Sequence, residues 1–81
     1  MPTVHRIGAI KIDVYSRDHL PPHFHAIYGD DEVLLVIRTL NIYAGSLPHG
    51  QLKSVRKWAK NSKVKNMLLE NFYRLNPKLR K

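Results

Sequence analysis

The stretch "HFHAIYGDDEVLLVI", residues 23–37, holds the pattern that decides the fold. Aromatic and branched residues that favour strands flank a Gly-Asp-Asp sequence at 29–31, which is typical of a tight turn. The second arm, residues 32–37, is apolar on both faces, as expected of a strand that lies inside a sheet or is covered by helices. The stretch therefore predicts a hairpin whose second strand is buried.

Two segments upstream and one downstream extend this hairpin into a sheet. Residues 10–15, "IKIDVY", alternate apolar and polar side chains with the period of two that indicates a half-buried strand. Residues 3–7 precede Gly8 and can pair with that strand as another hairpin. Residues 40–45, "LNIYAG", form a candidate fifth strand. We expect a small antiparallel or mixed sheet of four to five strands.

In the second half of the chain the apolar period changes from that of a strand to that of a helix. Leu52, Val55 and Ala59 recur at helical spacing and predict a first helix. We expect Ser46 to cap this helix, with Pro48 in its first turn, where a missing N–H is tolerated.

A second helix is predicted after Asn61, which can serve as its N-cap. Its apolar stripe, which ends near Pro77, contains Val64, Met67, Leu68, Phe72 and Leu75. Strands followed by helices are typical of an α+β fold in which the helices pack on one face of the sheet. We expect one domain over residues 1–81, with a β-rich half at 1–45 and a two-helix half at 46–81.

The formal net charge of +8 is concentrated in the two-helix half. Residues 46–81 contain ten lysines and arginines but a single acid, Glu70. Such an excess favours a polyanionic or acidic partner, because solubility alone would be served by charges of both signs. The candidate binding residues for nucleic acid or an acidic protein are Lys53, Arg56, Lys57, Lys60, Lys63 and Lys65.

Several classes of protein are disfavoured by what the sequence lacks. The chain has no cysteine, which excludes disulfides and thiolate metal ligands. Its longest wholly aliphatic run, residues 33–37, is far shorter than the ~20 residues that a membrane helix needs. The N-terminal "MPTVHRIGAIKI" has no signal-peptide pattern. We expect a cytoplasmic protein that does not bind membranes, and a homo-oligomer would stabilise so small a domain.

The segment "HLPPHFHA", residues 19–26, places three of the five histidines close together. On a strand, His23 and His25 point to the same face, with Cα atoms roughly 6.5 to 7 Å apart, so both imidazoles could bind one ion. His19 could fold back as a third ligand, with Asp18 as a fourth ligand or as the acceptor of an imidazole N–H. Such a set suits zinc, nickel or iron, so a divalent metal cofactor is one hypothesis.

Two other interpretations of the histidine segment stay open. Without a metal, His23 and His25 could act as general acid and base in the cleavage of RNA through its 2′-hydroxyl, with His19 and Asp18 assisting. Alternatively, the two prolines only stiffen the entry into an edge strand, on whose polar face the histidines lie.

Two segments resemble a known family: "SRDHLPPHFHAIYGDDE" at 16–32 and "GSLPHGQLKSVRKWAKNSKVKNMLLENF" at 45–72. They are similar to the bacterial family called domain of unknown function 4160. The matching motif positions are Asp18, His19, Pro21, Pro22, His23, His25, Tyr28 and Gly29. This family has no established reaction. The resemblance implies a neighbouring gene of the domain of unknown function 2442 type, and hence a two-gene system of the toxin–antitoxin kind.

Together these features predict a small bacterial module of a toxin–antitoxin-like system that binds nucleic acid or a cognate acidic protein through its basic C-terminal helices. The alternative hypothesis is a His-dependent nuclease or phosphodiesterase that uses the histidine segment, with or without a metal. A third interpretation is a structural subunit in which the histidine segment only shapes a surface.

Overall fold

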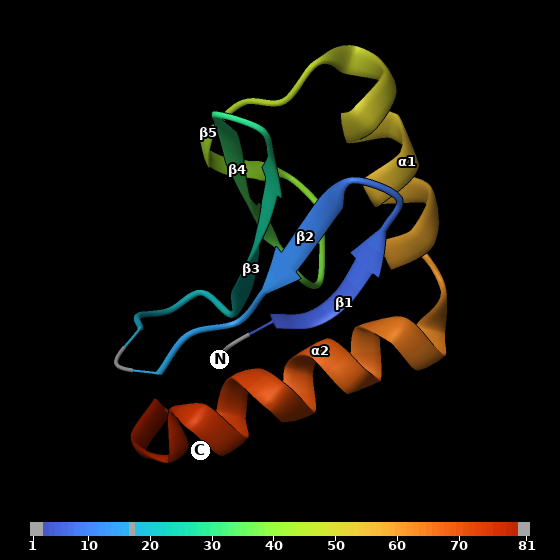
Figure 1. The fold of residues 1–81 in the computed structure, drawn as a ribbon. Helices are drawn as coiled ribbons and strands as arrows, with labels where there is room; N and C mark the ends of the chain where they lie inside the picture. Colours follow the sequence, from blue (N-terminus) through green and yellow to red (C-terminus); the bar gives the residue numbers. More distant parts are fainter. Residues whose placement is uncertain (1–2, 17, 80–81) are drawn as a thin grey trace.

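The computed structural model describes residues 3–16 and 18–79, which form a five-stranded antiparallel sheet followed by two helices (Figure 1). The strands are β1 Thr3–Ile7, β2 Ile10–Asp13, β3 His23–Tyr28, β4 Asp31–Val36 and β5 Ile42–Gly45. The helices are α1 His49–Ala59 and α2 Ser62–Leu75, and a short 3-10 helix follows at Pro77–Leu79. This arrangement confirms the predicted α+β fold and the candidate fifth strand.

The strands follow one another in the sheet in chain order, each antiparallel to the next. The predicted central hairpin is present: Tyr28 pairs with Asp31, and Gly29 makes the turn with a φ of +60°, which glycine adopts without steric cost. Because β3 pairs with β2 on one side and with β4 on the other, it is the middle strand of the sheet. The interpretation of the histidine segment as an edge strand is therefore wrong.

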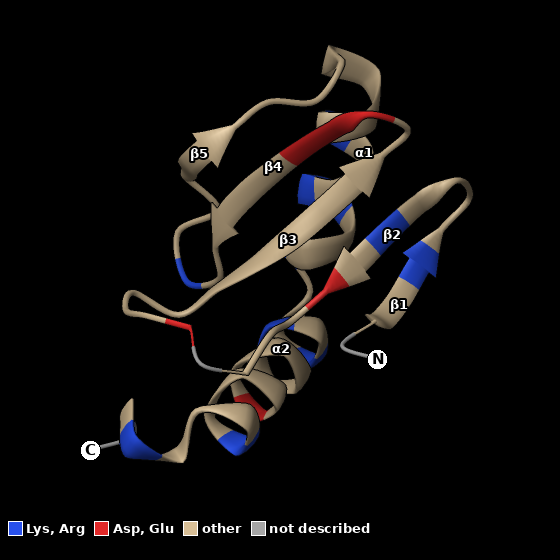
Figure 2. Cartoon of the chain, turned by 60° about the vertical axis from the view of Figure 1, so that its left-hand side comes forward, with Lys and Arg blue, Asp and Glu red and all other residues tan. Residues whose placement is uncertain are grey.

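The two faces of the sheet differ in what covers them. The helix face carries a buried core made of Ile10, Ile12, Phe24, Ala26, Val33 and Leu35, which cluster with Val55, Ala59, Leu68 and Phe72 of the helices. Trp58 of α1 meets Phe24 edge to face, with ring centroids 6.2 Å apart. Figure 2 shows α1 behind β3 and β4 on this side. The histidine face is the opposite side, to which His23 and His25 point because side chains alternate along β3.

The first helix begins later than the sequence predicted. Pro48 occupies the N-cap position in an extended conformation and no side chain caps the helix, so the expectation of a Ser46 cap is wrong. The reason is that the Ser46 N–H bonds to the Glu32 carbonyl at 3.0 Å, which keeps this residue attached to the sheet. The prediction that Asn61 caps α2 is confirmed, since its side chain accepts hydrogen bonds from the backbone N–H groups of Lys63 and Val64.

The second helix crosses beneath the end of the sheet where β3 begins (Figure 1). Its last residue, Leu75, is followed by Asn76, which is buried. Neither of the helices in the described part of the chain is long and apolar enough to cross a membrane.

Gly45, at the end of β5, is the glycine whose replacement should cost most. It has a φ of +75°, and a Cβ there would collide with the Glu32 carbonyl oxygen. We expect Gly45→Ala to lower the free energy of unfolding, measured with urea, by about 1–3 kcal/mol or more. Gly50→Ala is the matched control, because a Cβ at Gly50 meets open space; it should leave stability unchanged or raise it by up to about 1 kcal/mol. Equal stability of the two variants would contradict this account.

Candidate metal centre

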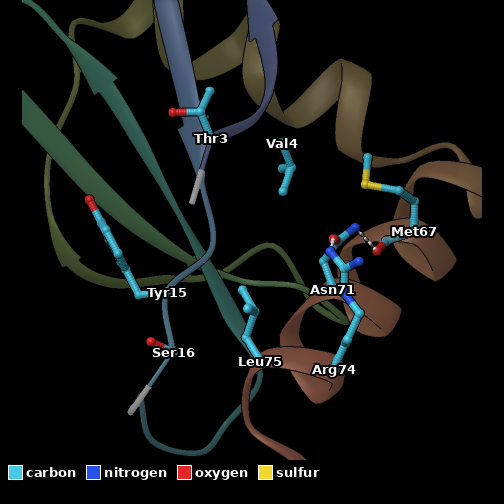
Figure 3. A pocket seen from close by; sticks show the side chains of 8 residues that line it. All are labelled: Thr3, Val4, Tyr15, Ser16, Met67, Asn71, Arg74 and Leu75. Atoms are coloured by element: carbon cyan, nitrogen blue, oxygen red, sulfur yellow. Dashed lines mark hydrogen bonds between the residues drawn. The ribbon is translucent and has the colours of Figure 1, made fainter. Parts of the chain in front are cut away.

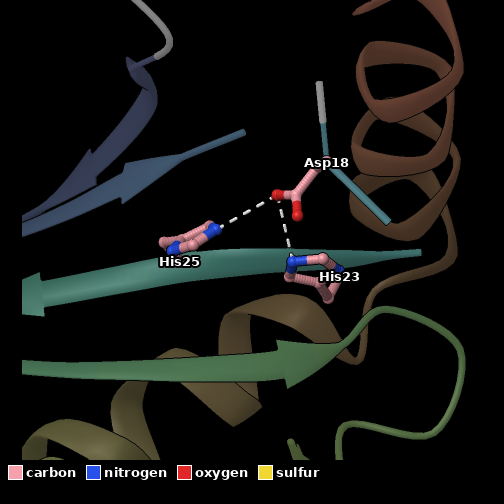
Figure 4. Close-up of side chains that lie close together, drawn as sticks. All are labelled: Asp18, His23 and His25. Atoms are coloured by element: carbon pink, nitrogen blue, oxygen red, sulfur yellow. Dashed lines mark hydrogen bonds and ion pairs between the residues drawn. The ribbon is translucent and has the colours of Figure 1, made fainter. Parts of the chain in front are cut away.

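Three side chains converge at the start of β3 on the histidine face (Figure 4). The Asp18 Oδ2 atom lies 3.1 Å from His23 Nε2 and 3.3 Å from His25 Nε2. One ligand-type atom from each of the three residues lies within 4.8 Å of the other two. This is the one such group of three or more found among the described residues, and it has the composition of a two-histidine, one-carboxylate metal site.

The histidines are placed by the strand, whereas the aspartate is placed by a distant helix end. His23 and His25 share a face because they are two residues apart on β3, which confirms the predicted alignment. The Asp18 backbone N–H donates to Asn76 Oδ1 at 2.8 Å, and Asn76 Nδ2 donates to the Tyr15 carbonyl at 2.9 Å. The buried Asn76 thus fixes both sides of the loop that brings Asp18 over β3.

Hydrogen bonds at the far side of each imidazole determine which nitrogen faces Asp18. His23 Nδ1 lies 2.9 Å from the Pro21 carbonyl oxygen, which can only accept, so this nitrogen carries the proton. His25 Nδ1 lies 2.9 Å from Glu32 Oε2 and donates to that carboxylate in the same way. In the neutral imidazole both Nε2 atoms are then unprotonated, and both present a lone pair to Asp18.

When both imidazoles are neutral, this arrangement places three lone-pair donors around one point, whereas a second proton on His25 would make its 3.3 Å contact with Asp18 Oδ2 a hydrogen bond. His23 Nε2 is completely buried and has no hydrogen-bond partner among the described residues, since Asp18 Oδ2 is close to it but not aligned with it. Such a buried polar atom is costly unless it carries a proton that pairs with Asp18, 3.1 Å away, or binds a metal ion. Ligand atoms about 2.0 to 2.2 Å from a tetrahedral Zn²⁺ stand about 3.4 Å from one another. The separations of 3.1 and 3.3 Å from Asp18 Oδ2 match this value, and the three atoms together lie within 4.8 Å of one another.

His19 lies at the mouth of the cluster rather than inside it. Its side chain is 58% exposed, and its Nε2 is 3.6 Å from Asp18 Oδ1, the oxygen that does not face the other histidines. Its ring stacks on His23 with centroids 5.0 Å apart. Of the predicted set of three histidines with Asp18 as a fourth ligand or N–H acceptor, Asp18, His23 and His25 come together, and His19 stands where an outer ligand or a proton carrier would. The catalytic roles predicted for these four residues stay predictions.

Tyr15 forms one side of the cluster and is a poor base at neutral pH. Its ring lies edge-on to His25 with centroids 4.4 Å apart, and its hydroxyl donates to Asp13 Oδ2 at 3.0 Å. Desolvation by burial, then the hydrogen bond to Asp13 and the charges of Asp13, Glu32 and Asp18 raise the pKa of Tyr15 to about 12. The phenol therefore remains a donor that holds the ring in place.

The predicted basic residues divide between structural and free roles. Arg56 Nε donates to the Leu40 carbonyl at 3.2 Å, and Lys65 Nζ donates to the Arg38 carbonyl at 2.8 Å, so both hold the turn between β4 and β5. The other four predicted residues have exposed side chains: Lys53, Lys57, Lys60 and Lys63. Figure 2 shows α1, with its basic residues in blue, behind β3 and β4. Since His23 and His25 point to the opposite face of β3, the basic side of α1 and the histidine cluster lie on opposite sides of the sheet.

A separate cavity of about 580 Å³ lies between the first strand and the last helix (Figure 3). It is lined by Thr3, Val4, Tyr15, Ser16, Met67, Asn71, Arg74 and Leu75. Arg74 Nη2 donates to Asn71 Oδ1 at 2.7 Å, and Asn71 Nδ2 donates to the Met67 carbonyl at 2.8 Å. The cavity contains none of the predicted site residues and shares only Tyr15 with the surroundings of the cluster.

Sequence reasoning missed four residues around the cluster. Glu32 could have been predicted from the hairpin. It pairs with Ile27, so its side chain lies on the same face as that of His25 and diagonally across from it. Tyr15 continues the alternation of β2, which indicated a strand but not a neighbour of His25. For Asn76 and Tyr43 the sequence carried no signal, because their contacts join segments far apart in the chain.

The fold and the site define a small α+β domain with two histidines and a carboxylate whose ligand atoms are close enough to share a metal ion. A family model described as domain of unknown function (DUF4160) matches residues 9–72, a span that includes the whole cluster. The chain therefore belongs to the DUF4160 family, as its motifs indicated. No curated protein and no solved structure matches it.

The raised pKa of Tyr15 predicts that its phenol ionises only at high pH. The chain has four tyrosines, and one phenol should ionise near pH 12, as followed by ultraviolet absorbance, and be missing from Tyr15→Phe. Since the folded pKa lies above 10.0, the ordinary value for a tyrosine, Tyr15 contributes stability that is complete below pH 10 and is lost as pH rises toward 12. A normal titration of all four tyrosines would contradict the described environment of Tyr15.

Proposed function

We propose that this protein is a metal-assisted phosphodiesterase whose centre is formed by Asp18, His23 and His25. The observation that carries the proposal is the convergence of two Nε2 lone pairs and a carboxylate oxygen on one point, with the buried His23 Nε2 otherwise unpartnered. Three protein ligands leave a coordination position for water or substrate, which is typical of catalytic rather than structural metal sites.

The protein groups around the centre have distinct tasks in this proposal. The Pro21 carbonyl and the Glu32 carboxylate hold the Nδ1 protons of the two histidines and so keep both Nε2 atoms directed at the ion. A bound divalent ion would activate a water molecule and stabilise charge on a phosphoryl oxygen. His19, exposed at the mouth beside Asp18, is placed to carry a proton to or from the reacting group.

The charge of the molecule supports a phosphodiester as the substrate. The net charge is +8, and the exposed side of α1 presents lysines without an acid on the same helix. A basic surface raises the local concentration of polyanions. Since α1 and the cluster lie on opposite sides of the sheet, binding at the helix and cleavage at the cluster are separable activities.

The metal site is tested by titrating protein purified without a histidine tag with Zn²⁺ or Co²⁺ in a calorimeter. We expect about one ion per chain, and a loss of at least about tenfold in affinity in His23→Gln and in His25→Gln, because each removes one of three ligands. His49→Gln on α1 is the matched control and should bind as the unchanged protein does.

Two outcomes of this titration would contradict the proposed metal centre. One is the absence of stoichiometric binding to the unchanged protein. The other is equal affinity in all three variants, with circular dichroism showing that each is folded. His25→Gln guards against misfolding of the His23 variant, because the His25 side chain is 13% exposed whereas that of His23 is fully buried.

A second candidate function is supported by the exposed side of α1 alone. In this second function the protein would act in a two-gene, toxin–antitoxin-like system. The exposed side of α1 would bind nucleic acid or an acidic cognate protein, such as a neighbour of the domain of unknown function 2442 type. Lys53, Lys57 and Lys60 are exposed, and a shallow groove among them also contains His49 and Leu52. No reaction at the histidine cluster is needed for this role.

Binding through α1 predicts a steep loss of affinity for single-stranded RNA or DNA as salt rises, because each neutralised phosphate releases counterions. The double variant Lys57→Glu, Lys60→Glu should bind more weakly and with a shallower salt dependence, whereas Lys57→Arg, Lys60→Arg should bind normally. Affinity that does not change with salt, or that is unaffected by charge reversal, would contradict a polyanion surface on α1.

A further inference from the structure

Three aromatic rings contact one another at the mouth of the candidate metal centre. His19 stacks on His23 with centroids 5.0 Å apart and planes inclined by 29°. Tyr43, on the edge strand β5, lies 5.7 Å from His23 with planes inclined by 21°, and 5.5 Å from His19. A metal ligand is thus flanked by two further rings that belong to neither the ligand set nor the core.

These two outer rings are available to a ligand. The Tyr43 residue is 48% exposed and the His19 side chain is 58% exposed, whereas the His23 side chain that both contact is completely buried. Tyr43 is one of three large hydrophobic residues that are exposed in the described part of the chain, and it contacts the cluster directly. Exposed aromatic rings beside a polar site are typical of surfaces that stack planar ligands.

We infer that Tyr43 and His19 form a platform for an unpaired nucleobase, so that the substrate of the proposed phosphodiesterase is single-stranded nucleic acid. This inference rests on the proposed function, because the phosphate is taken to lie at the metal. In a duplex the base faces are occupied by their neighbours, so only an unpaired base can lie on an exposed side chain. Both platform rings contact His23, with centroids 5.0 and 5.7 Å away. A base stacked on the platform and a phosphate at the metal can therefore belong to the same nucleotide.

The charge at the mouth makes this binding depend on the ion. Asp18 and Glu32 both carry carboxylates at the cluster, and Asp18 Oδ1 lies 3.6 Å from Nε2 of the exposed His19 ring. Without a cation these carboxylates repel a phosphate group, and stacking alone has to overcome that repulsion. Nucleotide binding should therefore be weak in the metal-free protein and appear when the ion is added.

The test compares adenosine monophosphate with ribose 5-phosphate, which has the same sugar and phosphate but no base. With Zn²⁺-loaded protein we expect the nucleotide to bind about tenfold more tightly, as one stacked base provides. Tyr43→Phe should keep this preference because the ring remains. Tyr43→Ala should lose it, binding both compounds about equally while its affinity for Zn²⁺ alone is unchanged.

The outcomes separate this inference from the proposal on which it rests. Equal binding of the two compounds by the unchanged, Zn²⁺-loaded protein, or a preference that survives in Tyr43→Ala, overturns the nucleobase platform and leaves the metal centre standing. Absence of Zn²⁺ binding in the unchanged protein overturns the metal-assisted function itself. Tighter binding of double-stranded than of single-stranded oligonucleotides of the same sequence would also contradict the platform.

Discussion

The candidate site depends on one constraint: the Asp18 carboxylate is held against two imidazoles whose outer nitrogens are already occupied. The Pro21 carbonyl and Glu32 accept the Nδ1 protons, so two neutral imidazoles turn their Nε2 lone pairs toward the Asp18 oxygen, and a proton or a metal ion is needed between them. In the interior of a protein such a meeting is unfavourable unless a positive charge lies between the groups. The burial of His23 makes the requirement strict, because water cannot reach its Nε2 atom.

The fold supplies this constraint from three separate elements. β3 aligns the histidines, β4 brings Glu32 to the back of His25, and the end of α2 holds the Asp18 loop through Asn76. Most of the hydrophobic core lies on the other side of the sheet, and His23 contacts it at the Phe72 ring, with ring centroids 5.7 Å apart. This division lets a domain of 81 residues keep one continuous core while it places a buried histidine at the opposite face.

How much the sequence could predict follows from the range of each interaction. The central hairpin and the shared face of His23 and His25 were predictable because turns and strand alternation are local properties. The inward position of Asp18 in place of His19 was not, since it depends on a hydrogen bond from Asp18 to Asn76, 58 residues away. The prediction of a Ser46 cap was wrong because of another contact between distant segments. The Ser46 N–H donates to the Glu32 carbonyl in the sheet, which the local sequence does not reveal.

The most direct measurement of the central claim is nuclear magnetic resonance of the histidine ring nitrogens, with and without Zn²⁺. The account predicts that, once Zn²⁺ is bound, His23 and His25 are protonated at Nδ1 and that the ion shifts their Nε2 resonances. The rings of His5 and His49, which lie outside the cluster, should not respond. Spectra in which Zn²⁺ leaves the Nε2 resonances of His23 and His25 unmoved, or moves all five histidines alike, would contradict it.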